Sequence, residues 1–176
     1  MLLYLFALED QGTSVLGDVP IPAGIQYFPA RVPMLSSDGS LSQEDAAQLR
    51  EKSWKRKGLI LKDDAVLAAM DPNEKPKRLN YTRKKDGSIS GDLADKAQLR
   101  LLKAYVFSLL GAMVDDIASG NVEANPYTRG NSHNACSFCP YGAVCHPEEV
   151  AGRRDYKAMS ADRFWDEIGK EMGSNG

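Results

Sequence analysis

The three cysteines constrain this chain most, because all of them lie within ten positions. Cys136, Cys139 and Cys145 are the only cysteines among 176 residues. Two cysteines separated by two residues can turn both sulfurs toward one ion, and a third can join them after the loop that Gly142 helps to bend. Zinc and iron–sulfur clusters take four ligands as a rule, and soft thiolates suit either. The spacing therefore predicts a metal or cluster site whose fourth ligand lies outside the cysteine group.

Two sources could supply the fourth ligand. His133 and His146 are the only histidines, and either would complete a Cys3His zinc site. His133 is the better candidate, because His146 directly follows Cys145 and neighbouring side chains diverge. A cysteine outside this sequence is the other source. A disulfide is disfavoured, because the cysteine count is odd and no signal peptide is evident. Free thiols predict a protein of the cytoplasm.

Composition excludes several classes of protein. At 43% hydrophobic and 26% charged residues, the chain can bury a real core and is not expected to be disordered. Its net charge of −2 gives no overall attraction to nucleic acid. No apolar run approaches the roughly 18 residues needed to cross a bilayer, so we expect no membrane association. Any contact with nucleic acid must rest on local charge.

Periodicity and capping residues predict helices alternating with short strands. Ser42 and Asp45 resemble a capping box, and Asp63 or Asp64 can cap the next helix. Helices are predicted at 1–12, 42–54, 63–70, 93–120 and 160–168, strands at 24–34 and 58–61, a hairpin at 79–90 around Asp86–Gly87, a loop at 36–39 and a mobile tail at 173–176. Prolines place the 24–34 strand at an edge or bulge. The apolar residues of the 93–120 helix predict a broad buried face, and Gly120 its end.

Basic residues gather in two groups that could contact phosphates. The first comprises Lys52, Lys55, Arg56 and Lys57 around Trp54, and the second comprises Lys75, Lys77, Arg78, Arg83, Lys84 and Lys85. Trp54 or Tyr81 is available to stack on a base. The other interpretation is a solvated charged face, which is the commoner role of such runs.

The order of these features resembles a known family. The chain has Leu2-Leu3-Tyr4 in an apolar helix, Gly24-Ile25-Gln26-Tyr27-Phe28-Pro29, a Lys57-Gly58-Leu59 turn, a long helix, Asn125-Pro126-Tyr127 and then the cysteine spacing. Together these resemble the C-terminal end of AddB, a subunit of bacterial AddAB helicase–nucleases that carries a RecB-type PD-(D/E)xK nuclease domain. The likeness extends from about Leu2 to Trp165, and the cysteine spacing is its most specific part.

This resemblance implies a fold and a function. The expected fold is α/β, the peripheral C-terminal portion of a PD-(D/E)xK nuclease domain, with a few strands packed by a long helix. Residues 1–150 would belong to the nuclease domain and include the cysteine loop, and 151–176 would form a final helix and tail. In the full-length protein the resemblance implies an ATP-dependent exonuclease that uses Mg²⁺ and processes double-strand DNA breaks for recombinational repair. An AddA-like subunit would be its heterodimer partner.

The resemblance also assigns roles to particular residues. Tyr4 matches the end of a Gln-x-x-x-Tyr motif whose Gln would precede Met1, so the family's metal-binding acidic residues and lysine would precede this sequence. We therefore assign no catalytic residue and expect the chain alone to be inactive. Tyr4 is either a DNA contact or a core aromatic. Cys136, Cys139 and Cys145 match three of the four ligands of a [4Fe–4S] cluster.

One alternative of a different class stays open at this point. The chain would then be a self-contained zinc-stabilised module, completed by His133 or His146, that binds nucleic acid or a protein through its basic hairpin.

Overall fold

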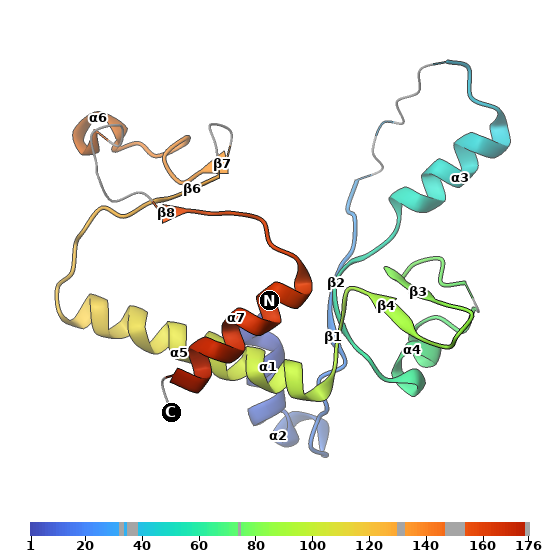
Figure 1. Ribbon diagram of the computed structural model, residues 1–176, viewed down its shortest axis with the longest axis horizontal. Coiled ribbons are helices and arrows are strands. Elements are labelled where there is room, and N and C mark those ends of the chain that lie inside the picture. The colour runs from blue at the N-terminus through green and yellow to red at the C-terminus, as the bar shows by residue number, and fades with distance from the viewer. Residues whose placement is uncertain (32–33, 35–38, 74, 130–132, 147–153, 175–176) are drawn as a thin grey trace. The chain divides into compact units, whose positions relative to one another are not determined.

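The computed structural model describes residues 1–31, 34, 39–73, 75–129, 133–146 and 154–174 (Figure 1). Helices and short strands alternate along it, as expected for an α/β fold. The chain divides into two compact units, Met1–Lys103 and Ala104–Gly176. The predicted domain limit between residues 150 and 151 lies outside the described residues and stays a prediction.

The first unit contains a three-stranded mixed sheet. Its strands are β1 (Gly24–Tyr27), β2 (Lys57–Leu61) and β5 (Leu93–Ala94), in the order β1-β2-β5. β1 runs antiparallel to β2, and β5 runs parallel to it. β1 therefore lies at an edge, as its neighbouring prolines predict. At Gly58, φ is +147° and an added Cβ would lie 2.0 Å from the carbonyl oxygen of Ile25, so the close approach of β1 and β2 requires glycine there.

The helices of this unit follow the prediction most closely where a side chain caps them. They are α1 (Leu2–Gln11), α2 (Thr13–Leu16), α3 (Gln43–Ser53) and α4 (Asp64–Met70). Ser42 Oγ accepts the N–H of Asp45 at 3.0 Å, and Asp63 Oδ1 accepts the N–H of Ala65 at 3.0 Å. Gly12 does not end its helix in the left-handed conformation. That role falls to Gly17, with φ +82°, at the end of α2.

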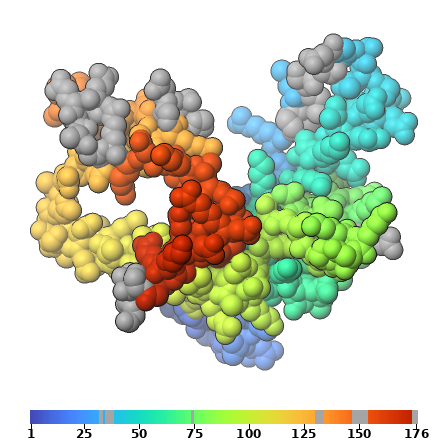
Figure 2. Space-filling view, viewed as in Figure 1, coloured from blue at the N-terminus to red at the C-terminus, as the bar shows by residue number. Residues whose placement is uncertain are grey.

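The hairpin predicted at Asp86–Gly87 is present and covers the main core. β3 (Tyr81–Arg83) pairs antiparallel with β4 (Ile89–Gly91), and Gly87 has φ +81°. The core comprises Ile60 of β2, Leu67 of α4, Leu79 and Tyr81. The hairpin and α4 lie side by side (Figure 1), and the hairpin segment forms part of the surface seen in Figure 2.

The long helix α5 (Lys96–Ala118) begins later than predicted. Its first turn is closed by a reciprocal pair, since the N–H of Gln98 donates to Asp95 Oδ1 at 2.8 Å and the N–H of Asp95 to Gln98 Oε1 at 2.9 Å. Residues 93–94, predicted helical, pair with β2 as β5 instead. Gly120 follows the helix end with φ +73°.

The predicted buried face of α5 exists only in its first half. Leu99 and Leu102 are buried, whereas Met113, Val114 and Ile117 are exposed, Ile117 by 77%. The prediction of one continuous core stripe is therefore wrong for the last turns. In the described part of the chain, α5 included, no helix has the length and apolar character needed to span a membrane.

The second unit carries the cysteine segment and the final helix. β6 (Tyr127–Arg129) pairs antiparallel with β7 (His133–Asn134) and parallel with β8 (Arg154–Asp155). α6 (Gly142–Cys145) follows β7, and α7 (Ala161–Ser174) ends the described chain. α7 is longer than predicted and includes residues 173 and 174 of the predicted mobile tail. Most of the loop predicted at 36–39 lies outside the described residues.

Candidate functional site

The cysteine segment is folded by local hydrogen bonds from the main-chain N–H of each cysteine. The N–H of Cys136 donates to Asn134 Oδ1 at 2.9 Å, and the N–H of Cys139 donates to the carbonyl of Cys136 at 3.1 Å. The N–H of Cys145, the last residue of α6, donates to the carbonyl of Tyr141 at 2.9 Å. The predicted turn between the first two cysteines is therefore present.

All three thiols are free, and two are half-buried. Cys136 and Cys145 have intermediate exposure and Cys139 is exposed. Reduced thiols are the soft donors that zinc and iron–sulfur clusters take, so the donor chemistry fits such a group. Among the described residues, however, no three His, Cys, Asp or Glu side chains gather closely enough to hold a metal ion. The assignment of Cys136, Cys139 and Cys145 as ligands stays a proposal.

The two histidines differ in what the structure says of them. His146 is exposed and stands at the end of α6 with φ +45°, the one non-glycine residue with positive φ in the described chain. It forms no metal-binding group with the cysteines in that part of the chain. His133 begins β7, and its role as a zinc ligand stays a prediction.

The second basic group is spread over a loop and the hairpin. Lys77 forms an ion pair with Glu51 at 3.7 Å, and Arg83 one with Asp64 at 2.7 Å. Lys75, Lys84 and Lys85 are exposed, the last two in the hairpin turn. Contact of this group with DNA stays a prediction, as it does for Tyr4.

Arg78 is the member of that group that joins the first basic group. It lines one pocket with Phe28, Pro29, Trp54 and Arg56, with a volume of about 360 Å³. The Arg56 guanidinium carbon lies 4.2 Å from the centroid of the Phe28 ring. The sequence prediction included Trp54, Arg56 and Arg78 but missed Phe28. Phe28 is brought to Arg56 by the β1–β2 register, which pairs Tyr27 with Lys57 and which the sequence alone does not specify.

A buried carboxylate holds the loop that carries Arg78. Asp71 is 6% exposed, and its Oδ2 accepts the N–H groups of Lys77 at 2.9 Å and Arg78 at 3.3 Å. Asn73 donates to Oδ1 through its side chain at 2.6 Å. Burial, the largest single influence, raises the pKa of Asp71, but these hydrogen bonds together lower it below the ordinary value of 3.8. Asp71 therefore remains ionised and keeps the loop in place.

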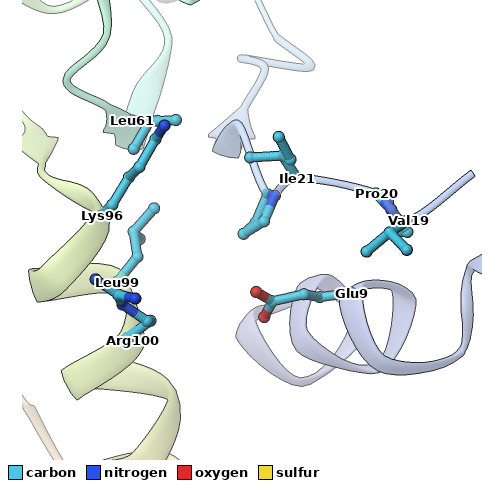
Figure 3. Close-up of a pocket in the computed structure, with 9 residues that line it drawn as sticks. Glu9, Val19, Pro20, Ile21, Leu61, Lys96, Leu99 and Arg100 are labelled. Carbon is cyan, nitrogen blue, oxygen red and sulfur yellow. The ribbon is translucent and has the colours of Figure 1, made fainter.

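A second opening lies beside α1. Its wall is formed by apolar residues, and charged residues complete the lining (Figure 3). The apolar residues are Val19, Pro20, Ile21, Pro22, Leu61 and Leu99, and the charged ones are Glu9, Lys96 and Arg100. Its volume is about 250 Å³. The wall is aliphatic and carries no aromatic ring, so it offers a base nothing to stack on. Glu9 is engaged by Lys103 Nζ at 3.0 Å.

Two aromatic residues with predicted roles differ in exposure. Tyr81, proposed as a stacking residue, is 6% exposed and belongs to the core, because the hairpin turns its side chain onto Leu67 and Leu79. The prediction that Tyr81 can stack on a base is therefore wrong. Tyr4 on α1 is 73% exposed in this chain, and its role as a DNA contact or a core aromatic stays a prediction.

Comparison with known proteins decides the family. The model of the PD-(D/E)XK nuclease superfamily matches residues 1–146. This chain belongs to the PD-(D/E)XK nuclease superfamily. The predicted resemblance to AddB is also confirmed, because curated relatives along nearly the whole chain are named as the B-type subunit of an ATP-dependent helicase/deoxyribonuclease.

Three relatives illustrate how this PD-(D/E)XK chain compares with them. The B-type subunit of the ATP-dependent helicase/deoxyribonuclease of Moorella thermoacetica is 38% identical over 98% of this chain and 15% of its own length. Proteins of the same name are 30% identical in Symbiobacterium thermophilum, over 96% of this chain, and 29% in Clostridium kluyveri, over 98%, each across 15% of its own length. The chain thus spans 15% of the length of these relatives. They do not support the self-contained zinc module.

Proposed function

We propose that this chain forms the C-terminal part of the nuclease domain in a helicase/deoxyribonuclease subunit of the AddB type. The observation that carries this proposal is the family match over residues 1–146 together with 38% identity along 98% of the chain to a protein of that name. In the whole protein the function would be degradation of DNA at double-strand breaks before recombinational repair. An AddA-like helicase–nuclease subunit would be the partner.

The chain's own contribution would be structural support and contact with DNA. In the whole protein the nuclease would use a divalent cation, Mg²⁺, which would activate a water for attack on the phosphodiester. No three acidic, His or Cys side chains among the described residues come together as such a site. We assign no catalytic residue to this chain and expect it to cleave nothing by itself.

We further propose that Cys136, Cys139 and Cys145 hold three corners of a [4Fe–4S] cluster, with the fourth ligand outside this chain. The support is the chemistry of three free thiols and the local hydrogen bonds from the main-chain N–H of each of them. When bound, such a cluster would cross-link this segment to a distant one and so stabilise the folded domain. Zinc is the alternative occupant.

A chimera tests the proposed function. This chain would replace the matching 15% of the Moorella thermoacetica protein, which would be purified with its partner subunit and given linear duplex DNA, ATP and Mg²⁺. Degradation above that of the relative with the same segment deleted supports the proposal. A folded chimera that assembles with the partner but degrades no DNA overturns it.

The chain alone supplies the complementary measurement. Incubated with Mg²⁺ and linear DNA, it should leave the DNA intact, because no catalytic residue is assigned to it. Robust cleavage that survives repurification of the chain would contradict this assignment.

A further inference from the structure

The end of the β1–β2 ladder brings an aromatic ring and a guanidinium together. The ladder ends with Tyr27 opposite Lys57, and continuing the same register by one residue places Phe28 opposite Arg56. Residues directly opposite each other in an antiparallel pair project on the same face. The Arg56 guanidinium carbon accordingly lies 4.2 Å from the Phe28 centroid, and Arg56 Nη1 donates to Gln26 Oε1 at 3.1 Å. Two contacts, one with Phe28 and one with Gln26, therefore position the Arg56 guanidinium.

Two further side chains complete the pocket. Trp54 directly follows α3, and its main-chain N–H donates to the carbonyl of Glu51 at 3.2 Å. Arg78 is placed by Asp71, and its carbonyl accepts the N–H of Arg56 at 2.8 Å. Phe28 is 65% exposed and Trp54 37%. An exposed Phe28 ring and a partly exposed Trp54 ring beside two arginine residues suit the binding of a flat, negatively charged ligand.

The surroundings of the pocket are basic. Segments 50–57 and 75–78 carry eight lysine and arginine residues and one acidic residue, Glu51. Glu51 is itself paired with Lys77. No acidic side chain is among the residues that line the pocket. This charge would attract a polyanion, while the rings would select one that carries flat bases.

The size of the pocket suits a single nucleotide. Its volume of about 360 Å³ is at the low end of the roughly 300–1,000 Å³ of ligand pockets. Bases in a duplex are stacked on their neighbours and cannot enter such a cavity, whereas an unpaired strand can turn one base into it. Two other described pockets lack such rings: the one beside α1 has an aliphatic wall, and one lined by Lys62 and Gly87 among others has no aromatic lining residue.

We propose that the pocket of Phe28, Trp54, Arg56 and Arg78 binds one unpaired nucleotide of single-stranded DNA. The base stacks on Trp54 or on the Phe28–Arg56 pair, and Arg78 contacts the adjoining phosphate. This inference rests on the proposed function in one respect, the choice of DNA as the polyanion. Beyond that function, the pocket proposal names the place where this part of the protein holds an unwound strand.

Fluorescence anisotropy with a labelled oligothymidylate of about 12 nucleotides tests the proposal on the 176-residue chain. Trp54→Ala should weaken binding on the order of 10-fold, the usual effect of losing one stacked base. Trp54→Phe, which keeps a ring, should lose less. Lys62→Ala, which removes an exposed charge outside the pocket, should change affinity little. Circular dichroism of each variant checks the fold.

Two matched probes separate stacking from charge. With an abasic strand of equal length, the difference between wild type and Trp54→Ala should disappear, because no base remains to stack. Arg78→Ala should weaken the binding of both strands. It should also make the negative slope of log affinity against log salt less steep by about 0.7, and Arg78→Lys should restore most of the lost steepness. Polyglutamate of equal charge should compete poorly, because it has no bases.

The outcomes distinguish this proposal from the proposed function. Absence of single-strand binding, equal losses for Trp54→Ala on normal and abasic strands, or effective competition by polyglutamate would each overturn the pocket proposal. An active chimera together with any of these results leaves the proposed function standing. An inactive chimera together with Trp54-dependent binding would overturn the nuclease role and keep the pocket.

Discussion

The main-chain N–H of Arg56 donates a hydrogen bond to the main-chain carbonyl of Arg78, with 2.8 Å between nitrogen and oxygen. This bond joins the segment entering β2 to the loop that precedes β3. Because both partners are main-chain atoms, this bond sets the spacing of the two arginines without using either guanidinium group. The geometry of the pocket consequently depends on what holds the Arg78 loop, which is Asp71.

Asp71→Ala should lower the free energy of unfolding by about 1–3 kcal/mol. The main-chain N–H groups of Lys77 and Arg78 would lose their part-buried hydrogen bonds to the carboxylate, and hydrogen bonds to a charged group are worth about that much. Urea titration monitored by circular dichroism measures the change. Asp18→Ala, at an exposed position, is the control and should stay within about 0.5 kcal/mol of wild type. Equal effects of the two substitutions would show that Asp71 does not hold the loop.

Asp71 also predicts a dependence of stability on acid. Its pKa in the folded state is lowered below 3.8 despite the opposing effect of burial, so the unfolded state binds the proton more readily. The stabilisation is therefore complete above the unfolded-state pKa and is lost as pH falls through 3.8 and then through the lower folded-state pKa. Unfolding free energies of wild type and Asp71→Asn, measured from neutral pH into this acid range, should converge as pH falls. Parallel curves would contradict the prediction.

Lys103→Met should destabilise the contact between α1 and α5 by about 1 kcal/mol. Lys103 Nζ lies 3.0 Å from Glu9 Oε2 and also bonds the carboxylate of Asp10. Because Asp10 is half-exposed, solvent screens the attraction between Asp10 and Lys103. The hydrogen bond to Asp10 is the largest cause that raises the pKa of Lys103, so this stabilisation is present below 10.5 and lost as pH rises through the folded-state value. Thermal unfolding should show no comparable loss for the exposed Lys96→Met, and equal losses would argue against the ion pair.

Gly58→Ala should destabilise the protein by at least about 1 kcal/mol, because its φ of +147° is unfavourable for alanine and the new methyl would meet the Ile25 carbonyl. Gly111→Ala is the matched control. It lies within α5 with open space around it, so alanine there should stabilise the helix by about 0.5–1 kcal/mol. Opposite signs in urea titrations are the expected result, and a neutral Gly58→Ala would mean that β1 and β2 can separate without cost.

The thiol assignment predicts a change in metal content. Purified without oxygen, the chimera with the Moorella thermoacetica protein should contain iron and sulfide and show the broad visible absorption of iron–thiolate bonds. Cys139→Ser should remove most of both, whereas Ser137→Ala should not. Stoichiometric zinc in the 176-residue chain that is lost on His133→Ala or His146→Ala would favour the zinc alternative instead.

Local signals predicted most of the elements in the first unit. Ser42 and Asp63 cap their helices as the sequence indicates, and Gly87 turns the hairpin. Such features act over a few residues and need no knowledge of the fold. The same holds for the resemblance to AddB, which follows from the order of short motifs.

Features that depend on tertiary pairing were not predictable. Leu93 looks like the start of a helix, but pairing with β2 draws it into a strand. Tyr81 carries the same local signals as an exposed strand residue, yet the core of Leu67 and Leu79 buries it. Contact between Phe28 and Arg56 requires the β1–β2 register, which periodicity alone does not specify.

The walls of the pocket come from three separate stretches of chain, joined by the β1–β2 ladder and by the bond from Arg56 to Arg78. These connections are main-chain hydrogen bonds, and every amino acid except proline has both the N–H donor and the C=O acceptor that they need. Natural variation or protein engineering can therefore change the exposed rings and charges while the frame persists. A Trp54→Tyr or Arg78→Gln variant becomes a way to retune which strand is held, how tightly and at what salt, without redesigning the domain.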